Sequence, residues 1–290
     1  MQLLGKLVMR GPLYAIAVAG LLGVLSLLVL PCAILSAAII ALVQLRKGGM
    51  QALAVIIGTL VFVTIGSEWI ATRPGLDFPI LIILLVPVYL GAMFLRGTES
   101  QGIAISVIIA CAAGFALSVQ IYSGDAALFW SDWLKEVMTG MQNITFEGFE
   151  KNDSLSILNG IIAMLLGFAA VSSLLLARWM QSALYNPGGF KQEFYHLSTP
   201  RMLFWNIVGL LGIIFLVDEL LFKNLFIVLA SIYFFQGVAV MHCNVSRLRR
   251  SPVNLLLPYF LMIFVPQFVI AGMACMGMVD VFLNFRKLPG

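Results

Sequence analysis

Long apolar runs separated by short polar segments dominate the pattern of hydrophobic and polar positions along this chain. A membrane-spanning helix needs about 20 consecutive apolar residues, whereas the strands of a membrane barrel alternate apolar and polar positions over about ten residues. The runs here are continuous and have the helical length. They predict spans at residues 11–29, 32–45, 50–66, 78–95, 101–121, 155–177, 203–221, 225–243 and 253–275. We therefore expect an all-α, polytopic membrane protein with about nine spans (eight to ten) in a single transmembrane domain, residues 1–290.

Prolines decide how two of these runs are divided. Residues 11–45 carry no charge, and as one helix they would be about 52 Å long at 1.5 Å per residue, against a hydrocarbon core of about 30 Å. Pro31 lacks an N–H and clashes with the preceding turn, so we expect the chain to turn near residues 29–33, at the outer face of the membrane. The last run contains Pro258 and Pro266. It forms either one long broken helix or a short hairpin, and the two alternatives place the C-terminus on opposite sides.

Composition excludes a soluble fold. Of the 290 residues, 61% are hydrophobic and only 10% are charged, whereas a soluble domain carries about 25% charged residues. A large share of any folded surface stays exposed, so a water-soluble fold could not hide so much apolar surface. We expect membrane lipid as a partner and no nucleic acid.

Basic residues are distributed unequally between the two sides of the predicted bundle. Alternate loops collect eleven of them, namely Lys6, Arg10, Arg46, Lys47, Arg96, Arg178, Lys191, Arg201, Arg247, Arg249 and Arg250. The opposite loops hold four, namely Arg73, Lys135, Lys151 and Lys223. Cytoplasmic loops are enriched in Lys and Arg, so we expect a bacterial inner-membrane protein with a cytoplasmic N-terminus. The first apolar run continues to residue 45 without a clear cleavage site, which favours an uncleaved span over a signal peptide.

An amphipathic helix is expected in the external loop 122–153. Its apolar positions recur at helical spacing and are Trp130, Trp133, Leu134, Val137, Met138 and Met141. The other face holds Ser131, Asp132, Lys135 and Glu136. A tryptophan can bury its ring and keep its N–H in water at the headgroup layer. The helix is therefore either an interfacial float or a lid over an external cavity.

A cytoplasmic connector is expected at residues 181–201. The sequence at 186–189, Asn-Pro-Gly-Gly, is strong turn chemistry. Phe190, Phe194 and Leu197 then lie on one face of a short helix. This segment is either an interfacial connector or a surface that docks a cytoplasmic partner.

Catalytic and cofactor motifs are not found in this sequence. It contains no GxxxxGK[ST], no GxGxxG after a strand and no HExxH. The four cysteines lie in apolar segments without CxxC or Cys/His ligand spacing, so we expect small apolar side chains rather than metal ligands. We expect no cofactor, no metal and no enzymatic activity. Any uphill transport would take its energy from another chain or from an ion gradient.

Polar residues inside the spans are the candidate site residues, because they are costly in hydrocarbon and must find partners. They are Asn159, Asn206, Asp218, Glu219, Gln236, Gln267 and Asp280. Each is either a ligand contact or a contact between helices, and the acids at 218 and 219 are also placed to reach the headgroups. Asn284 lies four residues after Asp280, and Arg286 is close enough for a bent chain. Ala15 and Ala19 form a small-xxx-small pair that permits close approach of helices.

Four motifs together resemble a known family. They are Leu30-Pro31 followed by Leu45-Arg46-Lys47-Gly48, Leu184-Tyr185-Asn186-Pro187-Gly188-Gly189-Phe190 with Glu193-Phe194, Gln236-Gly237-Val238-Ala239-Val240, and Gly277-Met278-Val279-Asp280 with Asn284-Phe285-Arg286. Nearly the whole chain resembles the YybS-like family of bacterial membrane proteins, whose domain is of unknown function. That family is similar to the S components of energy-coupling-factor transporters. The resemblance implies small-metabolite binding, partnership with a transmembrane coupling protein, and a helix-contact motif matched here by Ala15 and Ala19. This chain has more predicted spans than an S component.

Two functions follow as hypotheses. The first is a solute-binding or transport-related protein without its own energy source, and it expects an outward cavity lined by polar groups and capped by the 122–153 loop. The second is a non-transporting scaffold or assembly partner that docks a protein through its cytoplasmic loop. It expects a packed interior and an exposed aromatic patch at 181–201, including Phe190 and Phe194.

Overall fold

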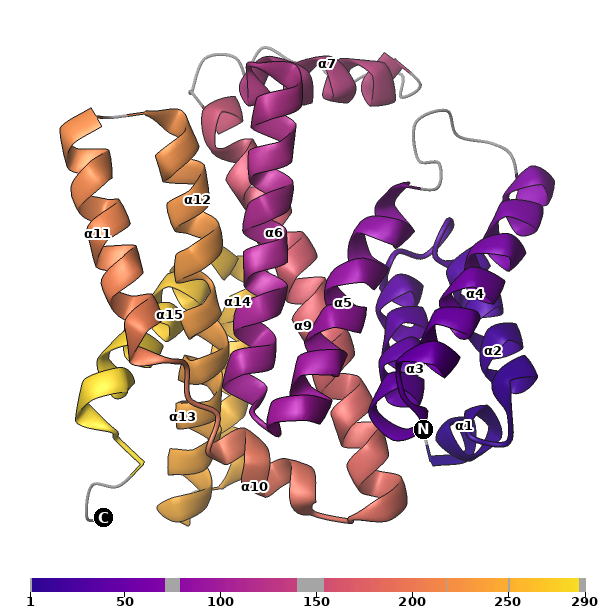
Figure 1. Cartoon of the computed structure of the whole chain (residues 1–290). Coiled ribbons are helices and arrows are strands. Elements are labelled where there is room, and N and C mark those ends of the chain that lie inside the picture. Colours follow the sequence, from indigo (N-terminus) through magenta and orange to yellow (C-terminus); the bar gives the residue numbers. More distant parts are fainter. Residues whose placement is uncertain (1, 71–78, 140–153, 218, 250, 287–290) are drawn as a thin grey trace.

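The computed structural model describes residues 2–70, 79–139, 154–217, 219–249 and 251–286, and every regular element in these residues is helical (Figure 1). The first part of the chain forms α1 Gln2–Val8, α2 Pro12–Leu25, α3 Pro31–Lys47, α4 Gly49–Ile70, α5 Pro79–Thr98, α6 Gln101–Ser123 and α7 Ala126–Thr139. The second part forms η1 Ser154–Ile157, α9 Leu158–Tyr185, α10 Gly189–Tyr195, α11 Arg201–Val217, α12 Leu220–Ala230, α13 Ile232–Arg247, η2 Pro252–Leu255, α14 Leu256–Phe264 and α15 Pro266–Leu283.

Six helical stretches in the described residues are long and apolar enough to cross a membrane. They are Gly49–Glu68, Leu81–Thr98, Gln101–Ser123, Leu155–Tyr185, Leu220–Arg247 and Pro266–Leu283. Three shorter apolar helices accompany them, namely Pro12–Leu25, Arg201–Val217 and Val253–Phe264. The protein is therefore an all-α, polytopic membrane protein, and the count of nine crossings stays a prediction.

The helix break at Pro31 is confirmed. α2 ends at Leu25 after 14 residues, and α3 runs for 17 residues from Pro31. At 1.5 Å per residue these helices are about 21 and 25 Å long, less than the hydrocarbon core of about 30 Å. In Figure 1, α2 and α3 stop well short of α7, whereas α6 and α9 reach it. The turn at residues 26–30 therefore lies further from α7 than the adjoining ends of α6 and α9 do, and its predicted place at the outer face stays a prediction.

The long central helix α9 exceeds the span predicted at 155–177. It continues to Tyr185 because Arg178, which ends the apolar run, is satisfied by Glu193 of α10. The spans predicted at 203–221 and 225–243 also shift. α11 ends at Val217, and α12 and α13 form one apolar stretch interrupted only at Ser231.

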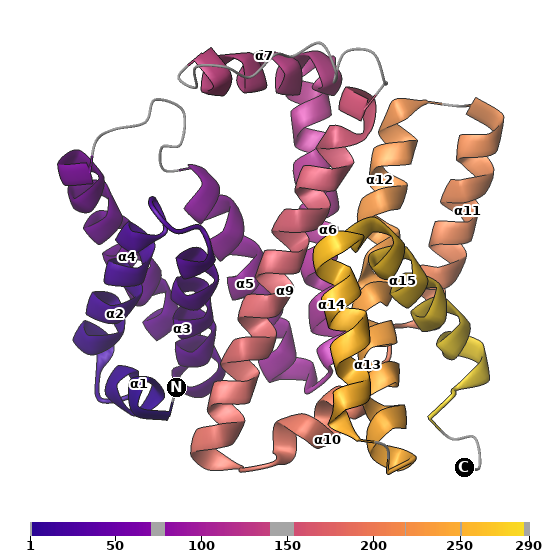
Figure 2. The same ribbon diagram turned by 180° about the vertical axis from the view of Figure 1, so that it is seen from behind.

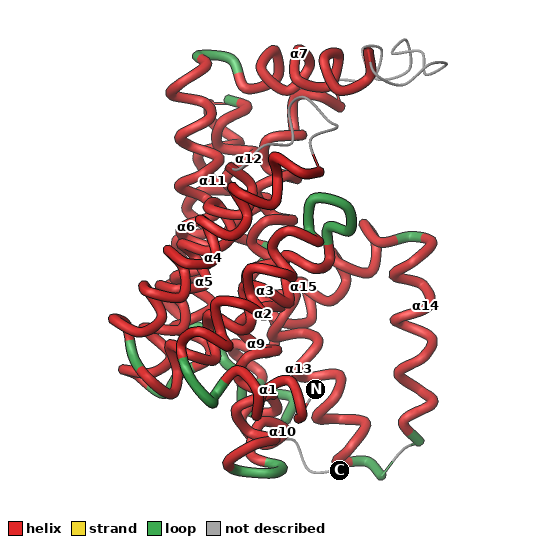
Figure 3. Tube along the Cα trace, turned by 90° about the vertical axis from the view of Figure 1, so that its right-hand side faces the viewer, coloured by secondary structure: helices red, strands yellow, loops and turns green. Residues whose placement is uncertain are grey.

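The predicted span 253–275 is two helices, and the chain folds back between them. α14 ends at Phe264, and α15 begins at Pro266, where a missing N–H costs nothing in the first helical turn. Figures 2 and 3 show α15 returning beside α13, toward the end at which α14 begins. The Arg247 guanidinium at the end of α13 donates to the carbonyl of Arg286 at 3.2 Å. Of the two alternatives for the last apolar run, one broken helix or a short hairpin, the structure has the hairpin.

The two ends of the bundle are chemically different. At one end, called the α10 end, α1 packs beside the last turns of α9 (Figure 1). There the Arg46 guanidinium lies 3.8 Å from the ring centroid of Tyr185. Most of the basic residues that the sequence assigned to one side belong to helix ends, or to α1 and α10, at this end. α7 lies across the opposite end, called the α7 end, where α12 begins (Figure 1). α7 carries Lys135, and the first turn of α12 carries Lys223.

Small residues allow close approach of helices in this bundle. α13 and α15 approach backbone to backbone, because a Cβ at Gly237 would stand 1.9 Å from the carbonyl oxygen of Met273, and one at Gly277 would stand 2.1 Å from that of Tyr233. In the other half of the bundle, α3 is almost wholly buried between α2, α5 and α9. Close packing of this kind associates helices where no hydrophobic force distinguishes protein from lipid.

Candidate functional site

The amphipathic helix predicted in the 122–153 loop is α7. The side chain of Asp125 caps its start and accepts hydrogen bonds from the amides of residues 127 and 128 at 2.9 and 3.1 Å. Trp130 faces the bundle and is buried, whereas Asp132 and Lys135 form an exposed ion pair on the outer face. Ser131, predicted on the polar outer face, is buried. Residues 140–153 of the loop, including Met141, lie outside the described residues.

A chain of amide hydrogen bonds fixes α7 to the helices beneath it. The indole N–H of Trp130 donates to Asn159 Oδ1 at 3.1 Å, and Asn159 Nδ2 donates to the carbonyl of Ala116 at 2.9 Å. The next residue, Gly160, donates its N–H to Asn224 Oδ1 at 2.6 Å. Asn159, one of the candidate ligand contacts, thus joins α7, α9 and α6, and Asn224, not singled out from the sequence, joins α9 to α12.

Beneath α7 lies a cavity of about 610 Å³. Its walls come from the start of α3, from α5, α6 and α9, and from the buried face of α7. They are Leu30, Pro31, Ala33, Ile34, Ile83, Leu84, Phe115, Val119, Phe129, Trp130, Trp133, Ile162, Leu165, Leu166 and Ala169. Small-molecule sites have volumes of about 300–1,000 Å³ and mostly apolar walls, so the size and the lining suit an apolar ligand.

The lining contradicts the expectation of a polar cavity. Every residue on the wall is aliphatic or aromatic, and the polar candidates that the structure describes are not among them. The N–H of Trp130, one polar group of the wall, is already bonded to Asn159. A polar solute would lose its hydration here without gaining hydrogen bonds. The physical reason is that the buried polar candidates, Asn159, Gln236 and Asp280, are used in contacts between helices.

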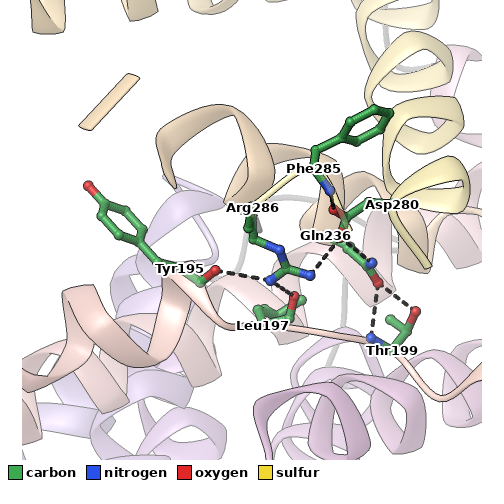
Figure 4. A network of polar contacts seen from close by, with 7 residues as sticks. All are labelled: Tyr195, Leu197, Thr199, Gln236, Asp280, Phe285 and Arg286. Atoms are coloured by element: carbon green, nitrogen blue, oxygen red, sulfur yellow. Dashed lines mark hydrogen bonds and ion pairs between the residues drawn. The ribbon is translucent and has the colours of Figure 1, made fainter. Parts of the chain in front are cut away.

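Asp280 shows this most clearly (Figure 4). Its carboxylate is buried and accepts from Arg286 Nη2 at 2.6 Å, from Gln236 Nε2 at 2.8 Å and from the amide of Phe285 at 2.9 Å. Gln236 Oε1 in turn accepts from the amide and the hydroxyl of Thr199, at 3.0 and 2.7 Å. Asp280 therefore binds the C-terminal segment to α13 and, through Gln236, to the loop that contains Thr199 before α11.

The guanidinium of Arg286 extends this network to the connector after α10. Its Nη1 donates to the carbonyls of Tyr195 and Leu197, at 3.0 and 2.8 Å. The buried charges are thus paired and hydrogen-bonded among themselves. The arrangement holds three segments together, and Gln236 and Asp280 serve as contacts between helices.

The other candidates are scattered. Asn206 on α11 and Gln267 on α15 are exposed on apolar helices, and Glu219 is exposed just before α12. Asp218 lies outside the described residues. Ala15 and Ala19 are fully buried, and the Ser36 hydroxyl of α3 donates to the carbonyl of Ala19 at 2.8 Å. This alanine pair therefore makes a helix contact within the chain and offers no surface to a partner.

A second cleft, of about 480 Å³, lies at the α10 end. The predicted turn and short helix are present, with Gly188 in the left-handed conformation at φ +90°. The rings of Phe190 and Phe194 stack at 5.7 Å between centroids. The cleft is lined by Gln2, Trp179, Ser182, Ala183, Pro187, Gly188, Phe190, Lys191, Phe194, Tyr195 and His242. Its walls therefore combine aromatic rings with a cation. Of the lining residues, the sequence predicted Phe190 and Phe194 as a partner surface, Pro187 and Gly188 as part of a turn, and Lys191 as a basic residue of the loop.

Within the described part of the chain, no three His, Cys, Asp or Glu side chains are grouped to hold a metal ion. Comparisons with protein-family models, with curated proteins and with solved structures found no match.

Proposed function

We propose that this protein is a membrane-embedded binding protein for an apolar small molecule, which it holds in the cavity beneath α7. The observation that carries the proposal is a cavity of about 610 Å³, lined by aliphatic and aromatic side chains, under an amphipathic helix. The role is binding rather than catalysis. It agrees with the resemblance to solute-binding S components in being solute-related and without an energy source of its own. The apolar walls favour an apolar compound among the small metabolites that this resemblance implies.

The proposed orientation puts the α10 end in the cytoplasm and α7 at the outer surface of the inner membrane. The excess of Lys and Arg at the α10 end supports it. α7 then lies in the headgroup layer, with Asp132 and Lys135 toward water and Trp130 over the cavity. In this position α7 is the lid that separates the site from the aqueous side.

The test compares the small molecules that copurify with three forms of the protein. Leu165 lines the cavity and is 54% exposed, so Leu165→Trp should obstruct the cavity at its opening with little strain in the packed core. Leu211 on α11 is 51% exposed, and Leu211→Trp is the matched control away from the cavity. Each protein is purified in the same detergent, extracted with organic solvent and analysed by mass spectrometry.

We expect an apolar compound in near-stoichiometric amount from the wild type and Leu211→Trp, and several-fold less from Leu165→Trp. Identical extracts from the three proteins would refute the proposal. Melting temperatures of the three proteins show whether the Leu165→Trp protein is folded.

A second function, assembly with a protein partner, is favoured by the aromatic cleft at the α10 end. Lys191 is exposed beside Phe190 and Phe194. If this surface docks an acidic segment, Lys191→Glu should abolish copurification of that partner while leaving the small-molecule extract unchanged. A copurifying protein that is retained equally by Lys191→Glu would exclude this surface as its docking site.

A further inference from the structure

The turn between α2 and α3 is built from apolar residues that face outward. Leu28, Val29 and Leu30 are 65%, 52% and 65% exposed. The two helices are too short to carry this turn across a hydrocarbon core of about 30 Å. In Figure 1, α2 and α3 end well below α7. We therefore expect the exposed leucines to meet lipid chains rather than water.

Much of the backbone of this turn is hydrogen-bonded locally. A non-helical segment at membrane depth must satisfy its own polar groups, because water is absent there. The amides of residues 26–29 donate to carbonyls of residues 22, 24 and 25 at 2.9–3.1 Å, and the hydroxyl of Ser26 donates to the carbonyl of Gly23 at 2.6 Å. Pro31 has no N–H to satisfy. Four of the five amides of residues 26–30 are thus bonded locally, and the carbonyls of residues 29 and 30 accept from the amides of residues 32 and 33 at 2.9 and 3.0 Å. Among the described residues, the amide of Leu30 and the carbonyls of residues 26–28 have no backbone partner.

The same turn forms part of the wall of the cavity. Leu30 and Pro31 line it from the α3 side, and Leu165 of α9 lines it while being more than half exposed. Lining residues that are also exposed mark where the cavity meets the surface of the protein. That surface is apolar, and we expect it at the depth of the lipid chains. α7 covers the side that faces the headgroups and water.

We propose that the cavity opens sideways into the hydrocarbon over the α2–α3 turn, and that its occupant is the hydrocarbon chain of a membrane lipid. This inference rests on the proposed function, since it names the ligand class of the same site. A ligand already dissolved in the bilayer gains no hydrophobic free energy on entry, so selection depends on contact with the walls. Phe115, Phe129 and Trp133 supply the rigid aromatic part of that contact. Along α9 the cavity runs from residue 162 to residue 169, about 10 Å at the helical rise, which is the length of part of a lipid chain.

The experiment uses a phospholipid with a photoreactive diazirine near the end of one acyl chain, in nanodiscs that contain the full-length protein. After irradiation, the crosslinked peptides are mapped by mass spectrometry. The test variant is Leu30→Trp, which narrows the opening. Its matched control is Leu28→Trp, because Leu28 lies in the same turn with the same 65% exposure but does not line the cavity. Leu165→Trp is a second blocking variant.

We expect the wild type and Leu28→Trp to crosslink at the walls formed by α6 and α9, and Leu30→Trp and Leu165→Trp to lose that crosslinking several-fold. The inference is overturned if the wild type shows no crosslink at these walls, or if both blocking variants crosslink as well as the control. The two failures are distinguishable. A non-lipid apolar compound whose copurification depends on Leu165, together with no lipid crosslink, would overturn lipid binding and leave the proposed function standing.

Discussion

Asp280→Asn should destabilise the protein by about 3–5 kcal/mol, the usual cost of breaking a buried ion pair from one side. The Asp280 side chain is fully buried, and its two oxygens accept from Arg286, Gln236 and the amide of Phe285. Asparagine keeps the shape but replaces one acceptor oxygen with an NH₂ donor. That donor then faces the donors of its neighbours, and the guanidinium of Arg286 keeps its charge without a counter-charge.

The effect can be read as a melting temperature of the detergent-solubilised protein, followed by tryptophan fluorescence. For chains of roughly this size, 1 kcal/mol corresponds to about 2–4 °C, so a fall of about 6–20 °C is expected. Asp132→Asn is the control for the loss of one acid. The Asp132 side chain is 64% exposed and its ion pair with Lys135 spans 3.7 Å, so the change should cost no more than about 1 kcal/mol.

A double-mutant cycle separates the ion pair from a general loss of packing. Arg286→Gln should also be strongly destabilising, because it leaves the carboxylate without its cation. The double variant should cost less than the sum of the singles by about 0.5–3 kcal/mol, because neither charge is then stranded. An unchanged melting temperature for Asp280→Asn, or strict additivity in the double variant, would refute the reasoning.

Three further predictions concern packing, α7 and orientation. Gly237→Ala puts a Cβ 1.9 Å from a backbone carbonyl of α15 and should cost at least about 1–3 kcal/mol, whereas Gly272→Ala, with open space around it, should be neutral or slightly stabilising; equal melting temperatures would contradict the close contact. Trp130→Phe removes the hydrogen bond from α7 to α9, so the amides of α7 should exchange with solvent several-fold faster, and unchanged exchange would show that other contacts hold α7. In a cysteine-free background, Asp132→Cys should react with an impermeant thiol reagent in intact cells and Lys191→Cys should not; the reverse pattern would invert the proposed orientation.

Local features of the sequence predicted the fold well. The helices follow from apolar runs, the break at Pro31 from proline chemistry, α7 from its 3.6-residue period and α10 from the turn at 186–189. Lengths and endings were predicted less well, because partners distant in sequence decide them. α9 continues past Arg178 because Glu193, on a different helix, neutralises the charge that ended the apolar run.

The site at Asp280 was predicted in part. The cost of a carboxylate in hydrocarbon required a partner, and Arg286 is that partner. Asn284 does not bind the Asp280 carboxylate. It ends α15 in the left-handed conformation, and its backbone N–H donates to the backbone carbonyl of Asp280. Gln236 contributes from 44 residues away. Such a pairing depends on the close approach of α13 and α15, which the sequence pattern alone does not contain.

The cavity beneath α7 could not be predicted from the sequence, because its walls come from five separate helices and each wall residue is an ordinary apolar residue of its own helix. The proline at position 31 is nevertheless a cause that the sequence contains. The break at this proline lets α3 fold back against α2 and pack on α5 and α9. The start of α3 then supplies Leu30, Pro31, Ala33 and Ile34 to the cavity wall. A continuous helix over residues 11–45 would remove this wall, so the break that determines the topology of α2 and α3 also helps to form the cavity.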